Sequence, residues 1–152
     1  MLKCKTRLIS GLFFLIIALP CLAQQTREDS LLVLYNNAKN DSVKAEIGLQ
    51  LGELLSTENR NKSNKYYQDA LQFATDKSNI GLIHYKIGFN NWQLGNFENA
   101  ISSFNRAAEY FEELQDSSWL GKTYNNIAAT NWGMGNINEA LNFYHIALNI
   151  RR

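Results

Sequence analysis

Residues 87–107 read IGFNNWQLGNFENAISSFNRA, and residues 127–147 read IAATNWGMGNINEALNFYHIA. The second stretch follows the first at a distance of 40 residues, and the match extends back to Ser78 and Ser118. Nine of the 35 positions aligned in this way are identical, whereas composition alone would give about two or three identities. A repeat of this length indicates a protein built from one supersecondary unit used several times.

Each copy of the repeat reads as two helices. Apolar residues recur at helical spacing over residues 80–94, and Gly95-Asn96 then provides a helix-stop signal. A second apolar face covers residues 97–111. We expect Asn96 to cap this second helix and Ser78 to cap the first. Because no segment alternates with a sustained period of two, the sequence predicts no strands.

A degenerate unit precedes these two copies. Apolar stripes at helical spacing continue upstream, between residues 43 and 74. The register of this unit is open, because Ala70 precedes Ala107 by 37 residues whereas Gly48 precedes Gly88 by 40. A turn that is shorter than the turn in the later copies would account for the difference.

The first 23 residues have the three parts of a secretory signal peptide. Residues 3–7 carry three positive charges, and residues 8–19 form an apolar run. Cys21 and Ala23 then stand three residues and one residue before a cut after Ala23. The apolar run is shorter than the roughly 20 residues that a membrane-spanning helix needs. We therefore expect an exported chain that begins at Gln24 and lies in the periplasm or on the extracytoplasmic face of the inner membrane.

Removal of this leader changes the composition of the chain. Both cysteines and the only proline lie within it, so the mature chain has no disulfide or thiolate chemistry. The mature chain keeps 12 basic and 14 acidic residues and has no clustered basic face, so nucleic-acid binding is not expected. An uncleaved membrane anchor and a lipoprotein are the alternatives. Pro20 disfavours lipidation of Cys21, because lipid attachment sites take a small residue before the cysteine.

Side chains with catalytic or metal-binding chemistry form no recognisable pattern. His84 and His145 are 61 residues apart and lack the spacing of metal ligands, so a packing role is expected for His84. The acidic run over residues 109–116 is expected to be a solvated helix face, because a cation site needs more converging oxygens. No phosphate-binding loop, nucleophile elbow or HExxH motif occurs. The sequence therefore predicts no enzyme, no cofactor and no metal site.

The repeated pattern resembles the tetratricopeptide repeat (TPR). The resemblance is carried by Ile87, Gly88, Trp92, Leu94, Gly95, Asn96, Phe97, Ala100, Phe104 and Ala107, and again by Ile127, Ala128, Trp132, Gly135, Asn136, Ala140, Leu141, Tyr144, Ala147 and Leu148. It implies an all-α fold, a right-handed superhelix of stacked helical hairpins, because one hairpin cannot bury its own apolar face. Small residues such as Gly88 and Ala140 are expected where helices pack tightly.

The sequence departs from the family pattern in three respects. The period is 40 residues instead of about 34, which implies helices longer by about a turn. The proline that usually closes each repeat is missing. Asn91 and Asn131 stand where the family usually has tyrosine.

The resemblance and the leader together divide the chain into five segments. They are a signal peptide at residues 1–23, a short leading helix at 24–40 that covers the first hairpin, a degenerate TPR-like hairpin at 41–77, and TPR hairpins at 78–116 and 117–152.

In TPR superhelices the first helix of each hairpin lines a concave groove. The groove residues that the resemblance implies here are Leu82, Tyr85, Phe89, Trp92, Gln93, Lys122, Asn125, Ala129 and Trp132. Aromatic side chains at these positions would suit a peptide or an extended protein segment. The alternative is that Trp92 and Trp132 mainly pack against the neighbouring hairpin. Phe89 and Ala129 do not match the family members that grip a C-terminal carboxylate, so that binding mode is not predicted.

The function expected from this layout is protein–protein interaction without catalysis. By analogy with exported repeats that precede a membrane helix and a kinase or regulator, we expect a sensor or scaffold region of a bacterial signalling protein. The alternatives are a free periplasmic scaffold or assembly factor, and a glycan-capture protein of the outer membrane. No later helix covers Leu141, Tyr144, Leu148 or Ile150, so we also expect an array that continues past Arg152 or self-associates through its last hairpin.

Overall fold

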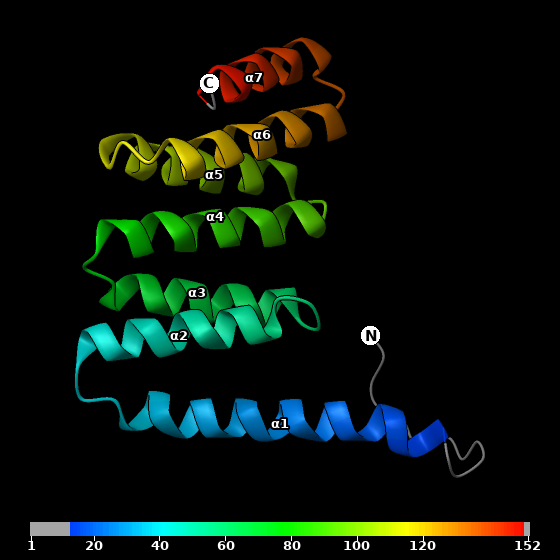
Figure 1. Cartoon of the computed structure of the whole chain (residues 1–152), viewed down its shortest axis with the longest axis vertical. Coiled ribbons are helices and arrows are strands. Elements are labelled where there is room, and N and C mark those ends of the chain that lie inside the picture. The colour runs from blue at the N-terminus through cyan, green and yellow to red at the C-terminus, as the bar shows by residue number, and fades with distance from the viewer. Residues whose placement is uncertain (1–12, 151–152) are drawn as a thin grey trace. The chain divides into compact units, whose positions relative to one another are not determined.

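The computed structural model describes residues 13–150, and within them it contains seven helices and no strand (Figure 1). The helices are α1 (Phe13–Asn37), α2 (Asp41–Leu55), α3 (Arg60–Phe73), α4 (Lys77–Gln93), α5 (Phe97–Glu113), α6 (Ser117–Gly133) and α7 (Ile137–Ile150). The chain forms two compact units, Met1–Asn37 and Ala38–Arg152.

The first unit contains one helix, α1, of 25 residues. It begins at Phe13, inside the expected signal peptide, and is therefore longer than the leading helix expected over residues 24–40. The difference arises because the apolar residues of the leader continue the helix in the uncleaved chain. The rest of the expected leader, residues 1–12, lies outside the described residues. Among the described residues, no helix is both long enough and apolar enough to cross a membrane.

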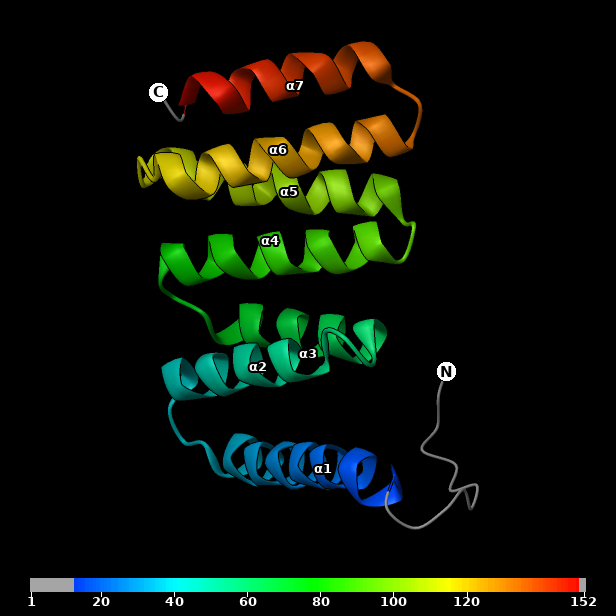
Figure 2. The ribbon, with the colours of Figure 1, turned by 45° about the vertical axis from the view of Figure 1, so that its right-hand side comes forward.

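The second unit is a stack of helical hairpins. Helices α2 and α3, α4 and α5, and α6 and α7 pair within their hairpins, and α3 contacts α4 as α5 contacts α6. Figures 1 and 2 show these hairpins following one another along the long axis. This arrangement confirms the predicted fold class, an all-α superhelix of stacked TPR-like hairpins.

Close packing between a glycine and an aromatic ring closes two of the hairpins. A Cβ atom built on Gly88 would lie 2.7 Å from the ring of Phe104, and one built on Gly52 would lie 2.2 Å from the ring of Tyr67. Gly52, and not Gly48, is therefore the counterpart of Gly88. The first hairpin is thus offset by 36 residues in its first helix and by 37 in its second, as expected for a turn one residue shorter.

The helix ends repeat one geometry three times. Gly95 and Gly135 have φ angles of +76° and +83°, and Gln115 takes the same left-handed conformation at the end of α5 with φ +53°. The first two positions suit glycine, because a side chain in this conformation costs roughly 1–2 kcal/mol. Two cap predictions were wrong in detail. Asp76 and not Ser78 caps α4, and Asn96 stands at the cap position of α5 without a side-chain hydrogen bond.

The repeated alanines are core residues. Ala100 and Ala140 are both fully buried, which confirms the expectation of tight packing at Ala140. Ala100 joins Phe104 and Ile127 in a cluster that spans α5 and α6. One predicted uncovered residue is in fact covered, because Ile150 packs against the cluster that contains Ala107, Ala108, Phe111 and Leu120.

The remaining apolar face of α7 is exposed in residues 38–150. Leu141 and Leu148 are 48% and 51% exposed, and Tyr144 is also exposed. Self-association through this face stays a prediction.

Candidate functional site

The nine predicted groove residues lie on α4 and α6, the first helices of their hairpins. Five of them are exposed: Phe89, Gln93, Lys122, Asn125 and Trp132. The other four are partly buried: Leu82, Tyr85, Trp92 and Ala129. The predicted set therefore divides into residues that a partner could reach freely and residues already engaged inside the stack.

The two equivalent tryptophans have different surroundings. Trp132 is 57% exposed, so the alternative of packing against a neighbouring hairpin does not describe it in this structure. Trp92 is partly buried and packs against the α5–α6 cluster that contains Phe104 and Ile127. Its ring also lies 5.7 Å from the ring of Phe89, which is 39% exposed. Phe89 and Trp132 are thus the accessible aromatic rings of the predicted set.

Tyr85 is a joint between hairpins more than a surface residue. Its ring lies 5.1 Å from that of Trp119 on α6 and 5.7 Å from that of Phe104 on α5. Asn126 donates a hydrogen bond of 2.9 Å from Nδ2 to the Tyr85 hydroxyl. Substitution of Tyr85 would therefore loosen the stack, and loss of a partner in such a variant would not identify a binding residue.

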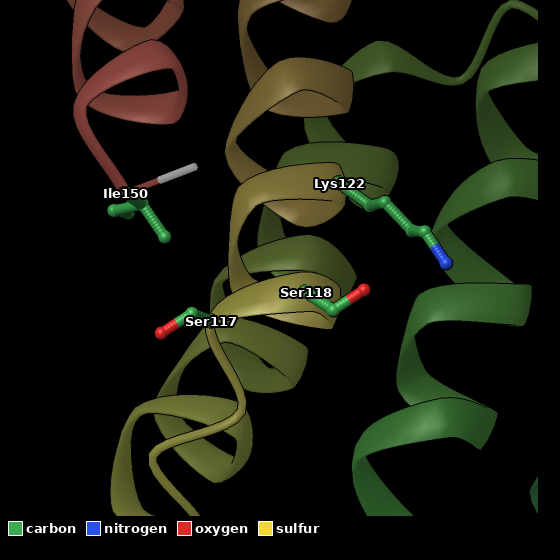
Figure 3. A pocket seen from close by; sticks show the side chains of 4 residues that line it. All are labelled: Ser117, Ser118, Lys122 and Ile150. Carbon is green, nitrogen blue, oxygen red and sulfur yellow. The ribbon is translucent and has the colours of Figure 1, made fainter. Parts of the chain in front are cut away.

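Lys122 has two local interactions. Its Nζ lies 4.2 Å from the centre of the Trp119 ring, a cation–π contact. It also lines an open pocket of about 440 Å³ together with Ser117, Ser118 and Ile150. Figure 3 shows the two serines at the start of α6 and Ile150 at the end of α7. Asp116 caps this end of α6 by accepting a hydrogen bond from the Trp119 amide, which places a carboxylate where an anion would otherwise bind.

The residues with titratable side chains have structural surroundings. The His84 ring stacks on Tyr110 at 6.1 Å, in agreement with the expected packing role. In the acidic run, Glu113 pairs with Lys77 across the α4–α5 hairpin, and both side chains are exposed. Within residues 13–150, no group of three or more His, Cys, Asp or Glu side chains is placed to hold a metal ion.

Acidification should destabilise the chain through His84. Burial lowers the pKa of His84, the nearby Arg106 lowers it further, and Glu109 opposes this shift. The unfolded chain binds this proton near pH 6.5, whereas the folded chain binds it only at lower pH. The contribution is therefore complete above about pH 6.5 and is lost as the pH falls through the folded pKa.

Urea unfolding at about pH 7.5 and about pH 5.5 measures this effect. His84→Tyr, which copies Tyr124 at the equivalent position, should lose less stability between these two pH values than the wild type loses. His145→Gln, at the exposed histidine, should behave as the wild type. Equal losses in the wild type and in His84→Tyr would contradict the assignment.

Known proteins share the repeated geometry of this stack. A family model described as tetratricopeptide repeat matches residues 79–152. This part of the chain belongs to the tetratricopeptide repeat family. The match takes in nearly all of α4 and the three helices that follow it. TPR arrays are protein-interaction modules and are generally not catalytic.

Solved structures extend the likeness to the first hairpin. The crystal structure of BtubC (BKLC) from P. vanneervenii is 19% identical, with a TM-score of 0.71 over 85% of this chain. The chain spans 57% of the length of that structure. The crystal structure of MamA is 16% identical, with a TM-score of 0.39, and the match covers 78% of this chain and 82% of MamA. No curated protein matches the chain. At these identities the BtubC likeness shows the fold alone.

Several structural residues were not singled out from the sequence. Asn126 holds the Tyr85 hydroxyl, and Trp119 stacks on Phe111 at 5.7 Å while receiving Lys122. Neither residue repeats, because the positions 40 residues earlier hold Lys86 and Asn79. A search for repeated residues could not find them.

Proposed function

We propose that these TPR hairpins bind a protein segment on the first-helix surface, as the extracytoplasmic sensor or scaffold region of a bacterial signalling protein. The observation that carries the binding proposal is the exposure of Trp132 and Phe89, at 57% and 39%. Large aromatic residues are enriched at protein interfaces, where they supply much of the binding energy. Other aromatic residues of the stack, such as Phe104 and Phe111, are fully buried.

Photocrosslinking in living cells can identify the partner directly. A benzophenone amino acid placed at Asn125 on α6 reports on the first-helix surface. The same amino acid at Asn105 on α5 is the matched control, because both asparagines are exposed. We expect a crosslinked protein that depends on position 125. Identical products from both positions would contradict the proposed surface.

Trp132→Ala should then weaken binding of the crosslinked partner by about tenfold or more, as truncation of an interfacial tryptophan commonly does. The fold should persist, because most of the side chain contacts solvent. Binding is measured by calorimetry and folding by thermal melts. Ile146→Ala on α7, also at an exposed apolar residue, is the control and should leave the affinity unchanged. Unchanged affinity in Trp132→Ala would exclude this residue from the site.

Export is the second part of the proposal. The charged start, the apolar run and the small residues at Cys21 and Ala23 support cleavage before Gln24. N-terminal sequencing of the protein from a bacterial periplasmic fraction should therefore begin at Gln24. A start at Met1 or a lipidated Cys21 would contradict it.

The alternatives give different results in the same experiments. A free periplasmic scaffold would be recovered in the soluble periplasmic fraction, with soluble proteins crosslinked at position 125. A glycan-capture protein would bind polysaccharide, and Trp132→Ala would lower that binding instead. A signalling sensor predicts that the crosslinked partner is a protein and that the crosslink forms outside the cytoplasm.

A further inference from the structure

The contact between the first two hairpins has an apolar end and a polar end. Helices α3 and α4 form this contact, which we call the first seam. Near the loop that joins them, Ala70 packs in a buried cluster with Ile83 and Ile87. At the opposite end, the start of α3 meets the end of α4 through hydrogen-bonding side chains. The two ends are therefore held by different forces.

The polar end consists of Ser63, Asn64, Asn90 and Asn91, which we call the polar latch. Asn90 is only 2% exposed and donates from Nδ2 to Ser63 Oγ and to Asn64 Oδ1, each at 2.9 Å. Asn64 in turn donates to Asn91 at 3.4 Å. Ser63 is fully buried and donates to the Gly52 carbonyl at 2.6 Å, which ties the latch to the first hairpin.

The second seam, between α5 and α6, is built differently. Ala100 occupies the position of Ser63, and Thr130 occupies that of Asn90. The Thr130 and Asn131 side chains both donate to carbonyls of their own helix and do not bond across the seam. This interface is larger than the first seam and is filled by apolar and aromatic side chains. The polar latch is thus a feature of one seam and not of the repeat.

These differences decide which seam opens more easily. Hydrogen bonds between side chains can be exchanged for hydrogen bonds to water with little net change in free energy, whereas exposing apolar surface is unfavourable. The other contact at this end that crosses from the first hairpin is the Lys86–Glu53 ion pair at 2.9 Å, which is partly exposed and likewise exchangeable. Opening would also hydrate the Tyr67 hydroxyl, which is buried without a hydrogen-bond partner among the described residues.

We propose that the first seam is a hinge, in which the polar latch opens while the cluster around Ala70 and Ile83 stays closed. The α2–α3 hairpin then swings about the α3–α4 loop relative to α4–α7. The movement changes the spacing between α2 and α4, the helices that Glu53 and Lys86 connect. A ligand that contacts both helices in only one state shifts the balance between the states. The hinge itself does not depend on the binding function proposed above.

Spin-label distances test the hinge directly. The labels are placed in the full chain after Cys4→Ser and Cys21→Ser remove the native thiols. Labels at Asn61 and Glu98 span the first seam at its latch end, and labels at Glu98 and Asn138 span the second. All three sites are exposed, and by the repeat registers they are equivalent positions in successive hairpins. We expect a broad or two-component distance distribution for the first pair and one narrow component for the second.

Two variants separate latch opening from general flexibility. The double variant Ser63→Ala, Asn90→Leu replaces the latch with apolar groups of similar size and should narrow the distribution across the first seam. Tyr67→Phe removes the unpartnered hydroxyl and should shift the distribution the same way, which keeps the test valid if the double variant does not fold. Equal widths across the two seams in the wild type would overturn the proposal. So would a first-seam distribution that Tyr67→Phe leaves unchanged.

Discussion

Phe104→Ala should lower the free energy of unfolding by about 3–5 kcal/mol, the usual range for truncation of a buried phenylalanine. Phe104 is fully buried and fills the space left by Gly88 in the facing helix. Its ring also supports Tyr85 at 5.7 Å and shares a cluster with Ile127 of the next hairpin. Its truncation therefore weakens both the α4–α5 hairpin and the seam to α6.

Urea denaturation followed by circular dichroism measures this loss. Phe89→Ala removes the same side chain from the same hairpin, but from a position that is 39% exposed, and should cost much less. Because small domains are stable by only about 5–15 kcal/mol, Phe104→Ala should also leave a visibly populated unfolded fraction at mild temperature. Similar unfolding midpoints for the two variants would mean that Phe104 does not join the hairpins.

The sequence predicts the fold well because repetition falls on the core. Identical residues 40 positions apart include Ala100 and Ala140, which are fully buried, and Ile87 and Ile127, which are buried as well. Packing fixes the size of these side chains in every hairpin, so they recur. A period of helical hairpins then leaves stacking as the way to bury their shared apolar face.

The candidate site is harder to predict because exposure depends on what packs beside a position. Trp92 and Trp132 are identical in the repeat, yet one packs against the α5–α6 cluster and the other is 57% exposed. The repeat register places Tyr85 in the groove, but its ring lies against Trp119 and its hydroxyl accepts a hydrogen bond from Asn126. Neither partner is repeated in the sequence, so neither contact has a periodic pattern.

The polar latch is hidden from sequence for a related reason. Ser63 and Asn90 meet across 27 residues of chain, and the equivalent positions hold Ala100 and Thr130. A comparison of repeats therefore shows these residues as degenerate. Only the packing of α3 on α4 brings the serine and the amides together.

Gly52→Val should destabilise the chain by about 3 kcal/mol, at the upper end of the range for overpacking. A Cβ atom at this position would lie 2.2 Å and 2.4 Å from two atoms of the Tyr67 ring. Tyr67 is only 1% exposed, so its ring cannot swing into solvent to make room. Gln50→Val in the same helix is the control, because Gln50 is exposed and the change should alter stability by at most about 0.5 kcal/mol.

A double-mutant cycle with Tyr67→Ala connects this effect to the ring. If Gly52 and Tyr67 form the same contact as Gly88 and Phe104, Gly52→Val should be far less harmful when Tyr67 is already truncated. The coupling should be on the order of 1–3 kcal/mol in urea denaturation. Additive losses would show that Gly52 does not face the ring, and the 36-residue offset of the first hairpin would then have to be replaced by the 40-residue offset through Gly48.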